Sequence, residues 1–225
     1  MKVTRNLAAV LPAFNEALSI GDVVSAVQKY ADVIVVDDGS TDRTADIARE
    51  KGAYVVAHSI NCGYDRALNS GMMWAASQGY TYAVTLDADG QHEPSSIMQF
   101  EQELIAGAEI VVGNRECTQR WSESAFSLIS RALWGIHDPL CGMKGYRLAT
   151  LQRAGSFDSY GSIGTELCIR ASRSGCVIRQ CSVHTLPRSD RSRFGGGLMA
   201  NMRIVRALLL GLILARSFRS SVIMT

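Results

Sequence analysis

The chain has 225 residues, of which 47% are hydrophobic and 20% charged, a composition typical of one packed globular domain. These values exclude disordered, collagen-like and low-complexity classes of protein. The net charge of +2 hides an asymmetry, because residues 1–110 carry 7 basic and 15 acidic side chains whereas residues 111–225 carry 16 and 6. We therefore expect a cation site in the first half and an anion site in the second, the alternative being two solvated faces of opposite charge.

Short runs rich in valine, isoleucine and aromatic residues alternate with helical patterns through the first half of the chain. The predicted strands cover residues 7–11, 33–36, 54–57, 82–86 and 110–112, and the predicted helices cover 17–30, 41–51, 66–78 and 94–106. This alternation predicts an α/β fold in which helices cover both faces of a mostly parallel sheet.

The second half is less regular. Its patterns predict an amphipathic helix over 121–134, a helix over 165–174, a strand over 177–183 and a long apolar helix from Gly195 towards Ala215. No repeat or linker separates these elements, so residues 1–225 are predicted to form a single domain.

Six cysteines occur without a C-x-x-C pair, which favours reduced thiols in the cytosol and gives no zinc-binding pattern. The longest apolar run, 207–215, has nine residues, whereas a membrane-spanning helix needs about 20. The N-terminal segment is interrupted by Pro12 and lacks the features of a signal peptide. We therefore expect a cytoplasmic protein without a transmembrane segment.

Polar residues follow four of the predicted strands. They lie in the segments PAFNE (12–16), DDGSTD (37–42), NCG (61–63) and DADGQH (87–92). Taken singly, each segment is also typical of an ordinary turn. Because ligands bind beyond the carboxyl ends of strands in such sheets, we expect these segments to meet in one site. The acidic side chains gathered there would repel one another without a cation or hydrogen-bond donors.

Asp87 and Asp89 are the clearest candidates for metal ligands in the sequence. In an extended segment, residues two apart lie on the same face, so both carboxylates can bind one divalent ion. Oxygen ligands suit Mg²⁺ or Mn²⁺. The alternative is a surface pair that caps the helix beginning at Pro94. His92 is expected to form a local hydrogen bond rather than to bind the metal.

The order and spacing of these segments resemble glycosyltransferase family 2, and within it the polyprenyl-phosphate hexose synthases, the branch of the dolichyl-phosphate mannosyltransferases. The resemblance continues through GNR (113–115), DPLCGMKGYR (138–147) and RSDRSRF (188–194), and so covers nearly the whole chain. It implies the GT-A fold, a Rossmann-like sheet to which amphipathic or interfacial helices are added at the C-terminus.

The resemblance also implies roles for individual residues. It implies that the nucleotide is held at the first three strand ends, by Pro12, Ala13, Asn15, Glu16, Asp37, Asp38, Asn61 and Gly63. A metal site of Asp87, Asp89 and Gln91 would bridge the diphosphate, and Asp87 would also contact ribose or sugar. Basic residues would meet the acceptor phosphate or donor diphosphate, namely Arg115, Lys144, Arg188 and Arg193. Asp89, Arg115 and Lys144 are then the catalytic candidates.

The implied reaction is transfer of a hexose, with inversion, from a GDP- or UDP-sugar to a polyprenyl phosphate, with Mg²⁺ or Mn²⁺ and without a nucleic acid partner. A lipid monophosphate is largely anionic at neutral pH, so this acceptor needs no general base. Residues 1–113 would form the nucleotide-sugar half, 114–200 the acceptor half and 201–219 an interfacial helix.

Several positions depart from the family pattern. The family's Asn-x-Gly-Lys-Gly continues here as Tyr64-Asp65, so a lysine near the nucleotide is missing. Cys141 replaces a serine, and Asp190 replaces a glycine. Lys144 stands for an arginine, which keeps the charge but loses the bidentate fork that arginine offers a phosphate. These changes leave the identity of the sugar and of the acceptor undetermined by the resemblance.

The C-terminal segment 188–219 holds seven arginines and one aspartate around its apolar run. Such a helix tends to lie in the membrane interface, which predicts peripheral attachment to the cytoplasmic face. The alternatives are a core helix or a contact within a homo-oligomer. The helix over 121–134 is a second interfacial candidate, with Arg131 near the acceptor phosphate.

Three other functions remain open from the sequence. Transfer to a hydroxyl acceptor would need a carboxylate base, for which Glu166 and Asp138 are the candidates. A phospho-acceptor receiver domain has a similar acidic pocket, but it is about half as long and needs a lone aspartate where this chain has His58-Ser59. A nucleotide-sugar binder without activity would fit the missing lysine at position 64.

Overall fold

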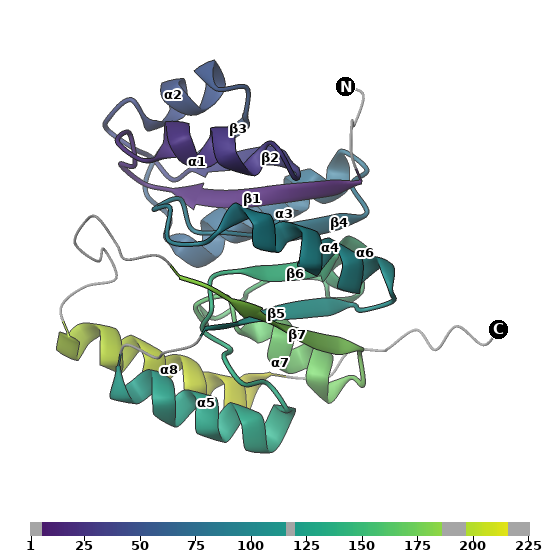
Figure 1. Cartoon of the computed structure of the whole chain (residues 1–225). Coiled ribbons are helices and arrows are strands. Elements are labelled where there is room, and N and C mark those ends of the chain that lie inside the picture. Colours follow the sequence, from purple (N-terminus) through teal and green to yellow (C-terminus); the bar gives the residue numbers. More distant parts are fainter. Residues whose placement is uncertain (1–5, 116–119, 186–196, 216–225) are drawn as a thin grey trace.

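The computed structural model describes residues 6–115, 120–185 and 197–215. A seven-stranded sheet runs through it in the order β3-β2-β1-β4-β6-β5-β7 (Figure 1). The strands are β1 (Leu7–Ala13), β2 (Asp32–Asp37), β3 (Tyr54–Ala57), β4 (Tyr82–Thr85), β5 (Ile110–Arg115), β6 (Lys144–Arg147) and β7 (Ile178–Val183). Only β6 is antiparallel to its neighbours β4 and β5 among these described strands. The predicted α/β fold with a mostly parallel sheet is confirmed.

Helices cover both faces of the sheet. They are α1 (Ile20–Val27), α2 (Thr44–Glu50), α3 (Tyr64–Ser77), the short 3₁₀ helix η1 (Pro94–Ser96), α4 (Ile97–Ile105), α5 (Trp121–Trp134), α6 (Leu148–Ala154), α7 (Glu166–Arg173) and α8 (Gly197–Leu214). One core cluster packs α1, α2 and α4 against the sheet, and the other packs α3 and α5 to α8 against the opposite face. Because β1 is covered on both sides, it is apolar throughout instead of alternating.

Two predicted helices begin later than expected because their first residues donate hydrogen bonds to a neighbouring loop instead of extending the helix. The helix predicted over 17–30 runs only from Ile20 to Val27, and the amide of Ala17 donates instead to Asp42 Oδ2 at 3.2 Å in the loop after β2. The helix predicted from residue 41 begins at Thr44, because the amide of Thr41 donates instead to Asn15 Oδ1.

Strand β6 and helix α6 were not predicted. The sequence of β6 is KGYR, which lacks the apolar run expected of a buried strand, and yet Lys144 is 3% exposed. Pairing on both sides, with β4 and with β5, makes this short polar segment a central strand. The local pattern cannot reveal such a strand, because its stability comes from neighbours distant in the sequence.

Helices α5 and α8 lie side by side as an outer layer below the sheet (Figure 1). Ser122 Oγ and Asn201 Oδ1 are 2.5 Å apart at their contact. Helix α5 has its predicted bounds, 121–134. Within the predicted interfacial segment 201–219, residues 201–214 belong to α8, and residues 216–219 lie outside the described residues. No helix in the described part of the chain is long and apolar enough to cross a membrane.

Candidate active site

A cavity of about 490 Å³ opens at the carboxyl edge of the sheet. Its walls come from the ends of β1 and β5, the segments after β2, β3 and β4, and helices α3, α5 and α8. The predicted site residues that line it are Pro12, Ala13, Glu16, Asp38, Asn61, Gly63, Asp87, Asp89, Gln91 and Arg115. Segments from four strand ends therefore meet in one place, as their sequence pattern predicts.

Asn15 supports this edge without lining the cavity. Its backbone has a positive φ of 54°, a conformation that asparagine adopts more readily than most residues. Its amide donates to Ser40 Oγ at 2.9 Å, and its Oδ1 accepts from the amide of Thr41 at 2.8 Å. These bonds join the loop after β1 to the loop after β2 and so fix this end of the cavity.

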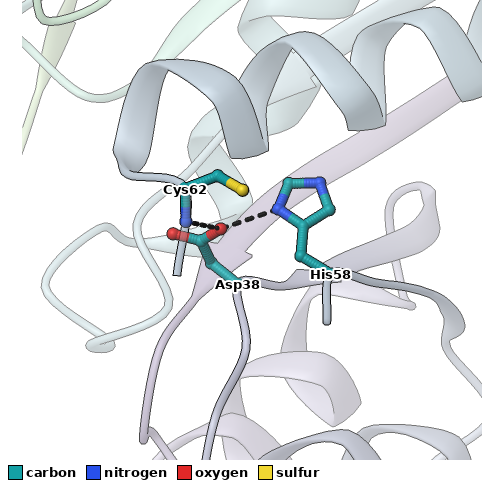
Figure 2. A group of neighbouring side chains, drawn as sticks. All are labelled: Asp38, His58 and Cys62. Carbon is teal, nitrogen blue, oxygen red and sulfur yellow. Dashed lines mark hydrogen bonds and ion pairs between the residues drawn. The ribbon is translucent and has the colours of Figure 1, made fainter. Parts of the chain in front are cut away.

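Asp38 is the best-satisfied carboxylate of the site. It is 4% exposed and accepts from the amides of Cys62 at 2.9 Å and Gly63 at 2.7 Å, while His58 Nδ1 lies 2.7 Å from its Oδ1 (Figure 2). The loop can approach this closely because Gly39 has no side chain: a Cβ there would lie 2.5 Å from the backbone of Ile60. These bonds hold the Asp38 carboxylate in place at the cavity wall.

Asp37, the preceding residue, does not line the cavity. It ends β2, is 6% exposed, and its Oδ1 has no hydrogen-bond partner among the described residues. A buried carboxylate oxygen without a hydrogen-bond donor is energetically unfavourable.

The segment of Asp87 and Asp89 is a turn and not the extended stretch that the sequence suggested. Strand β4 ends at Thr85, and the turn begins at Ala88. The expectation of two carboxylates on one face of a strand is therefore wrong, although both residues line the same cavity. Asp89 Oδ1 accepts from the amide of Gln91 at 3.1 Å, which closes the turn.

Asp87 is held from two sides. Its Oδ1 accepts from the Tyr64 hydroxyl at 3.3 Å, and His92 Nε2 lies 3.3 Å from its Oδ2. Burial would raise the pKa of Asp87, but the hydrogen bonds from His92 and Tyr64 and the positive charge of Lys144 outweigh it, so the pKa is lowered. The carboxylate is thus ionised at neutral pH, as a metal ligand must be. The local hydrogen bond expected of His92 is present.

The oxygen atoms of Asp87, Asp89 and Gln91 fit a hard divalent cation. Two carboxylates and one amide line the same cavity, and such all-oxygen donor sets suit Mg²⁺ or Mn²⁺. Gly142 leaves the space that Asp87 occupies, because a Cβ at position 142 would lie 2.3 Å from Asp87 Oδ2.

The basic candidates differ in their placement. Arg115 lines the cavity, but its guanidinium is bidentate with Asp138, at 2.7 and 3.0 Å, and also contacts Glu123 at 3.4 Å. Lys144 does not line the cavity; it is buried, and its positive charge acts on Asp87. Arg188 and Arg193 lie outside the described residues.

The two candidate bases for a hydroxyl acceptor are both held by other groups. Asp138 is 3% exposed and pairs with Arg115. Glu166 is also 3% exposed, accepts from the Ser159 hydroxyl at 2.8 Å and pairs with Arg170 at 3.3 Å, and it does not line the cavity.

Sequence reasoning missed several cavity residues that belong to distant segments. Tyr64 and Ile163 line the middle of the cavity, and Arg120, Arg203 and Ile204 line the end beside α5 and α8. Tyr64 directly follows the N-x-G motif, a position that could have drawn attention. The arginines carry no local signal, because only the packing of α8 on α5 brings them to the cavity.

The sheet order defines the GT-A fold. The fold matches that of glucosyl-3-phosphoglycerate synthase from Mycobacterium tuberculosis, with a TM-score of 0.74 at 23% identity over 92% of this chain and 80% of the other. A second structure of that enzyme, in complex with Mn²⁺, UDP and glucosyl-3-phosphoglycerate, gives a TM-score of 0.71 at 22% identity.

The family follows from the sequence comparison. The family model described as glycosyl transferase family 2 matches residues 8–147, so the chain belongs to this family, as its motifs imply. The chain is 30% identical over 216 residues to the undecaprenyl-phosphate mannosyltransferase of Micrococcus luteus, covering 84% of this chain and 88% of the other. It is 28% identical over 220 residues to the dolichyl-phosphate hexose transferase of Haloferax volcanii, covering 91% and 94%.

Proposed function

We propose that this chain is an inverting, metal-dependent hexosyltransferase that moves a hexose from a GDP- or UDP-sugar to a polyprenyl phosphate at the cytoplasmic face of a membrane. One observation carries this proposal: a single cavity has carboxylate and amide oxygens along one wall and residues of the basic, apolar helix α8 along another. The relatives named as undecaprenyl-phosphate and dolichyl-phosphate sugar transferases support the choice of acceptor.

The donor would occupy the wall formed by the first three strand ends. Pro12, Ala13 and Glu16 would contact the nucleoside together with Asp38 and the loop at Asn61 and Gly63, which all line the cavity. Asp37 and Asn15 would act on this wall from behind it. Asp87, Asp89 and Gln91 would hold Mg²⁺ or Mn²⁺, which when bound neutralises the charge of the leaving diphosphate.

The proposed step is one displacement at the anomeric carbon. A phosphate oxygen of the lipid forms a bond to this carbon, the bond from the carbon to the diphosphate breaks, and the nucleoside diphosphate leaves with that electron pair. A single displacement inverts the configuration. The phosphate oxygen is already anionic, so no side chain has to remove a proton. This acceptor suits a site in which Asp138 and Glu166 are both engaged in ion pairs.

Positive charge would bring the two anions together. Arg203, Arg115 and Arg120, which pairs with Glu123 at 3.0 Å, all line the cavity. The ion pair with Asp138 fixes the Arg115 guanidinium, so Arg115 would act from a preorganised position. Lys144 would act through Asp87, whose pKa it helps to lower. Arg188 and Arg193 remain predicted phosphate ligands.

The outer layer of α5 and α8 would rest on the membrane. Apolar side chains stand exposed along it, among them Trp121, Leu128, Met202, Leu209 and Ile213 at 52–74% exposure. Arg203 and Ile204 belong to the same helix and line the cavity, so a lipid phosphate lifted slightly from the interface would meet the basic end of the site.

The test is a transfer assay with the full-length chain in detergent and lipid, using labelled GDP- and UDP-hexoses and two matched acceptors, a polyprenyl phosphate and the same polyprenol without phosphate. We expect one labelled glycolipid, formed only from the phosphate and only with Mg²⁺ or Mn²⁺. Transfer to the polyprenol or to a glycan hydroxyl would instead support the hydroxyl-acceptor alternative. Nucleotide-sugar binding without any transfer would contradict an enzymatic role.

A further inference from the structure

A second group of metal-binding side chains lies beside the nucleoside end of the cavity. Asp38, His58 and Cys62 each offer one ligand atom, and these atoms all lie within 4.8 Å of one another (Figure 2). We propose that this cluster binds Zn²⁺ or a similar thiol-seeking divalent cation, at a site separate from that of Asp87 and Asp89. The consequence for the enzyme, loss of donor binding, rests on the proposed function because Asp38 belongs to the proposed nucleoside wall.

The cluster is organised before any metal arrives. Asp38 and His58 follow β2 and β3, and the loop of Cys62 is fixed by its own amide, which donates to Asp38 Oδ1 at 2.9 Å. Ser70 Oγ lies 2.9 Å from His58 Nε2 and orients the ring from the opposite side. A polar partner on the second ring nitrogen is the usual arrangement around metal-binding histidines.

A metal ion would replace the proton that joins two of the ligands. His58 Nδ1 lies 2.7 Å from Asp38 Oδ1, and since an ionised carboxylate only accepts hydrogen bonds, Nδ1 donates there. In a tetrahedral zinc site, with bonds of about 2.0–2.3 Å, ligand atoms lie about 3.3–3.8 Å apart. A small separation of these two side chains, with the Cys62 thiol released from Ile60 O at 3.4 Å, would make room for the ion.

The donor set selects the kind of metal. One thiolate, one imidazole and one carboxylate are the ligand types of Zn²⁺, with water as the fourth ligand, whereas Mg²⁺ prefers oxygen alone. Two negative charges and a neutral imidazole would balance the ion, and binding would release protons. The three ligands come from positions 38, 58 and 62, which only the fold brings together, so they form no recognisable zinc-binding spacing in the sequence.

The first experiment measures metal binding to the full-length chain, freed of metal and without nucleotide. Titration with Co²⁺ should give a thiolate-to-cobalt absorption band, and competition with a chromogenic chelator should give the affinity for Zn²⁺. We expect one high-affinity equivalent, weakened about 100-fold or more by Cys62→Ser or His58→Gln and about 10-fold by Ser70→Ala. Cys181→Ser and His137→Gln are the matched controls and should bind as the parent does.

Absence of the thiolate band, or equal Zn²⁺ affinity in the parent and in folded Cys62→Ser and His58→Gln, would overturn the site.

The second experiment measures GDP and UDP binding with Mg²⁺ present, with and without Zn²⁺, in the parent and in Cys62→Ser. Because nucleotides chelate Zn²⁺ equally in both samples, a loss of nucleotide affinity confined to the parent reports the site itself. If Zn²⁺ affects nucleotide affinity equally in the parent and in the variant, the proposed inhibition of donor binding is overturned. The zinc titration contains no nucleotide, so it tests the zinc site independently of the proposed transferase function.

Discussion

Asp65 lies at the start of α3, and its carboxylate does not line the cavity. It accepts from the amides of Gly164 at 2.7 Å and Ile163 at 3.3 Å, beside the carboxyl group of Asp158. Burial and the neighbouring Asp158 charge raise the pKa of Asp65 to about 7, although the two amides lower it. Ile163 lines the cavity with a positive φ of 59°, so Asp65 supports a strained part of the wall.

This raised pKa predicts a stability that depends on pH. An unfolded aspartate has a pKa of about 3.9, so between about pH 4 and pH 7 the folded chain binds more protons than the unfolded chain. Stability due to Asp65 is therefore complete below about pH 4 and is lost as the pH rises to about 7. Asn resembles the protonated acid, so Asp65→Asn should lack this loss. Urea unfolding of both proteins should show their difference changing by up to about 1.4 kcal/mol per pH unit in this window. A constant difference would contradict the raised pKa.

The ion pair of Arg115 and Asp138 predicts a large loss of stability when it is broken. Asp138→Ala leaves the mostly buried guanidinium of Arg115 without its bidentate partner, so the free energy of unfolding should fall by about 3–5 kcal/mol in urea denaturation. Asp46→Ala is the matched control, because Asp46 pairs with Arg49 on the surface, and it should cost less than about 1 kcal/mol. Similar losses of unfolding free energy in both variants would show that the buried Arg115–Asp138 pair contributes no more to stability than a surface pair does.

Among individual residues of the site, the sequence could predict those that lie directly after a strand. Asp38 and Asp87 were predicted because polar residues interrupt an otherwise apolar strand pattern. Lys144 and Arg115 were predicted as phosphate ligands from a family motif, which cannot reveal that one is buried, with its charge acting on Asp87, and the other paired with Asp138. Such placements depend on packing between segments more than twenty residues apart.

Two glycines, Gly71 and Gly142, let neighbouring elements approach closely, and we expect different effects when each is replaced by alanine. Gly71 of α3 packs on β1, where a Cβ would lie 2.4 Å from Val10 Cγ1, whereas a Cβ at Gly142 would strike the Asp87 carboxylate. Gly71→Ala should therefore lower the free energy of unfolding by about 1–3 kcal/mol with nucleotide affinity unchanged below the melting temperature. Gly142→Ala should lose Mn²⁺-dependent nucleotide binding while still folded, as calorimetry and circular dichroism would show. Normal binding by folded Gly142→Ala would contradict the role of Asp87.

Element prediction succeeded where local pattern and final environment agree. Strands β1, β2, β4 and β5 were found because each contains a run of buried apolar residues, and the half-buried β3 was found because its residues are apolar or aromatic. Helix α5 was found because its apolar stripe has helical spacing. Strand β6 was missed because its KGYR sequence is stabilised by β4 and β5 on either side. The start of α2 was misplaced because the amide of Thr41 donates to Asn15 Oδ1 in the loop after β1.

For the molecule as a whole, the exposed apolar layer of α5 and α8 predicts binding to membranes. The full chain should sediment with anionic lipid vesicles, less so at high salt because its arginines contribute electrostatically. The double variant Leu209→Ser, Ile213→Ser removes two side chains that are 52% and 74% exposed on α8, and it should weaken vesicle binding at least about 10-fold. Leu18→Ser, at a site 94% exposed before α1, is the matched control. Equal effects of the two changes would contradict docking through α8.

The central claim is that the turn after β4 holds a divalent cation together with a nucleoside diphosphate. The most direct measurement is the binding of Mn²⁺ and GDP or UDP to the full-length chain, followed through the paramagnetic resonance signal of free Mn²⁺, in the parent, in Asp89→Asn and in the surface control Asp46→Asn. Nucleotide should increase Mn²⁺ binding in the parent and in Asp46→Asn, whereas Asp89→Asn should weaken Mn²⁺ binding about 10- to 100-fold with the fold intact. Unchanged Mn²⁺ and nucleotide binding by Asp89→Asn would contradict it.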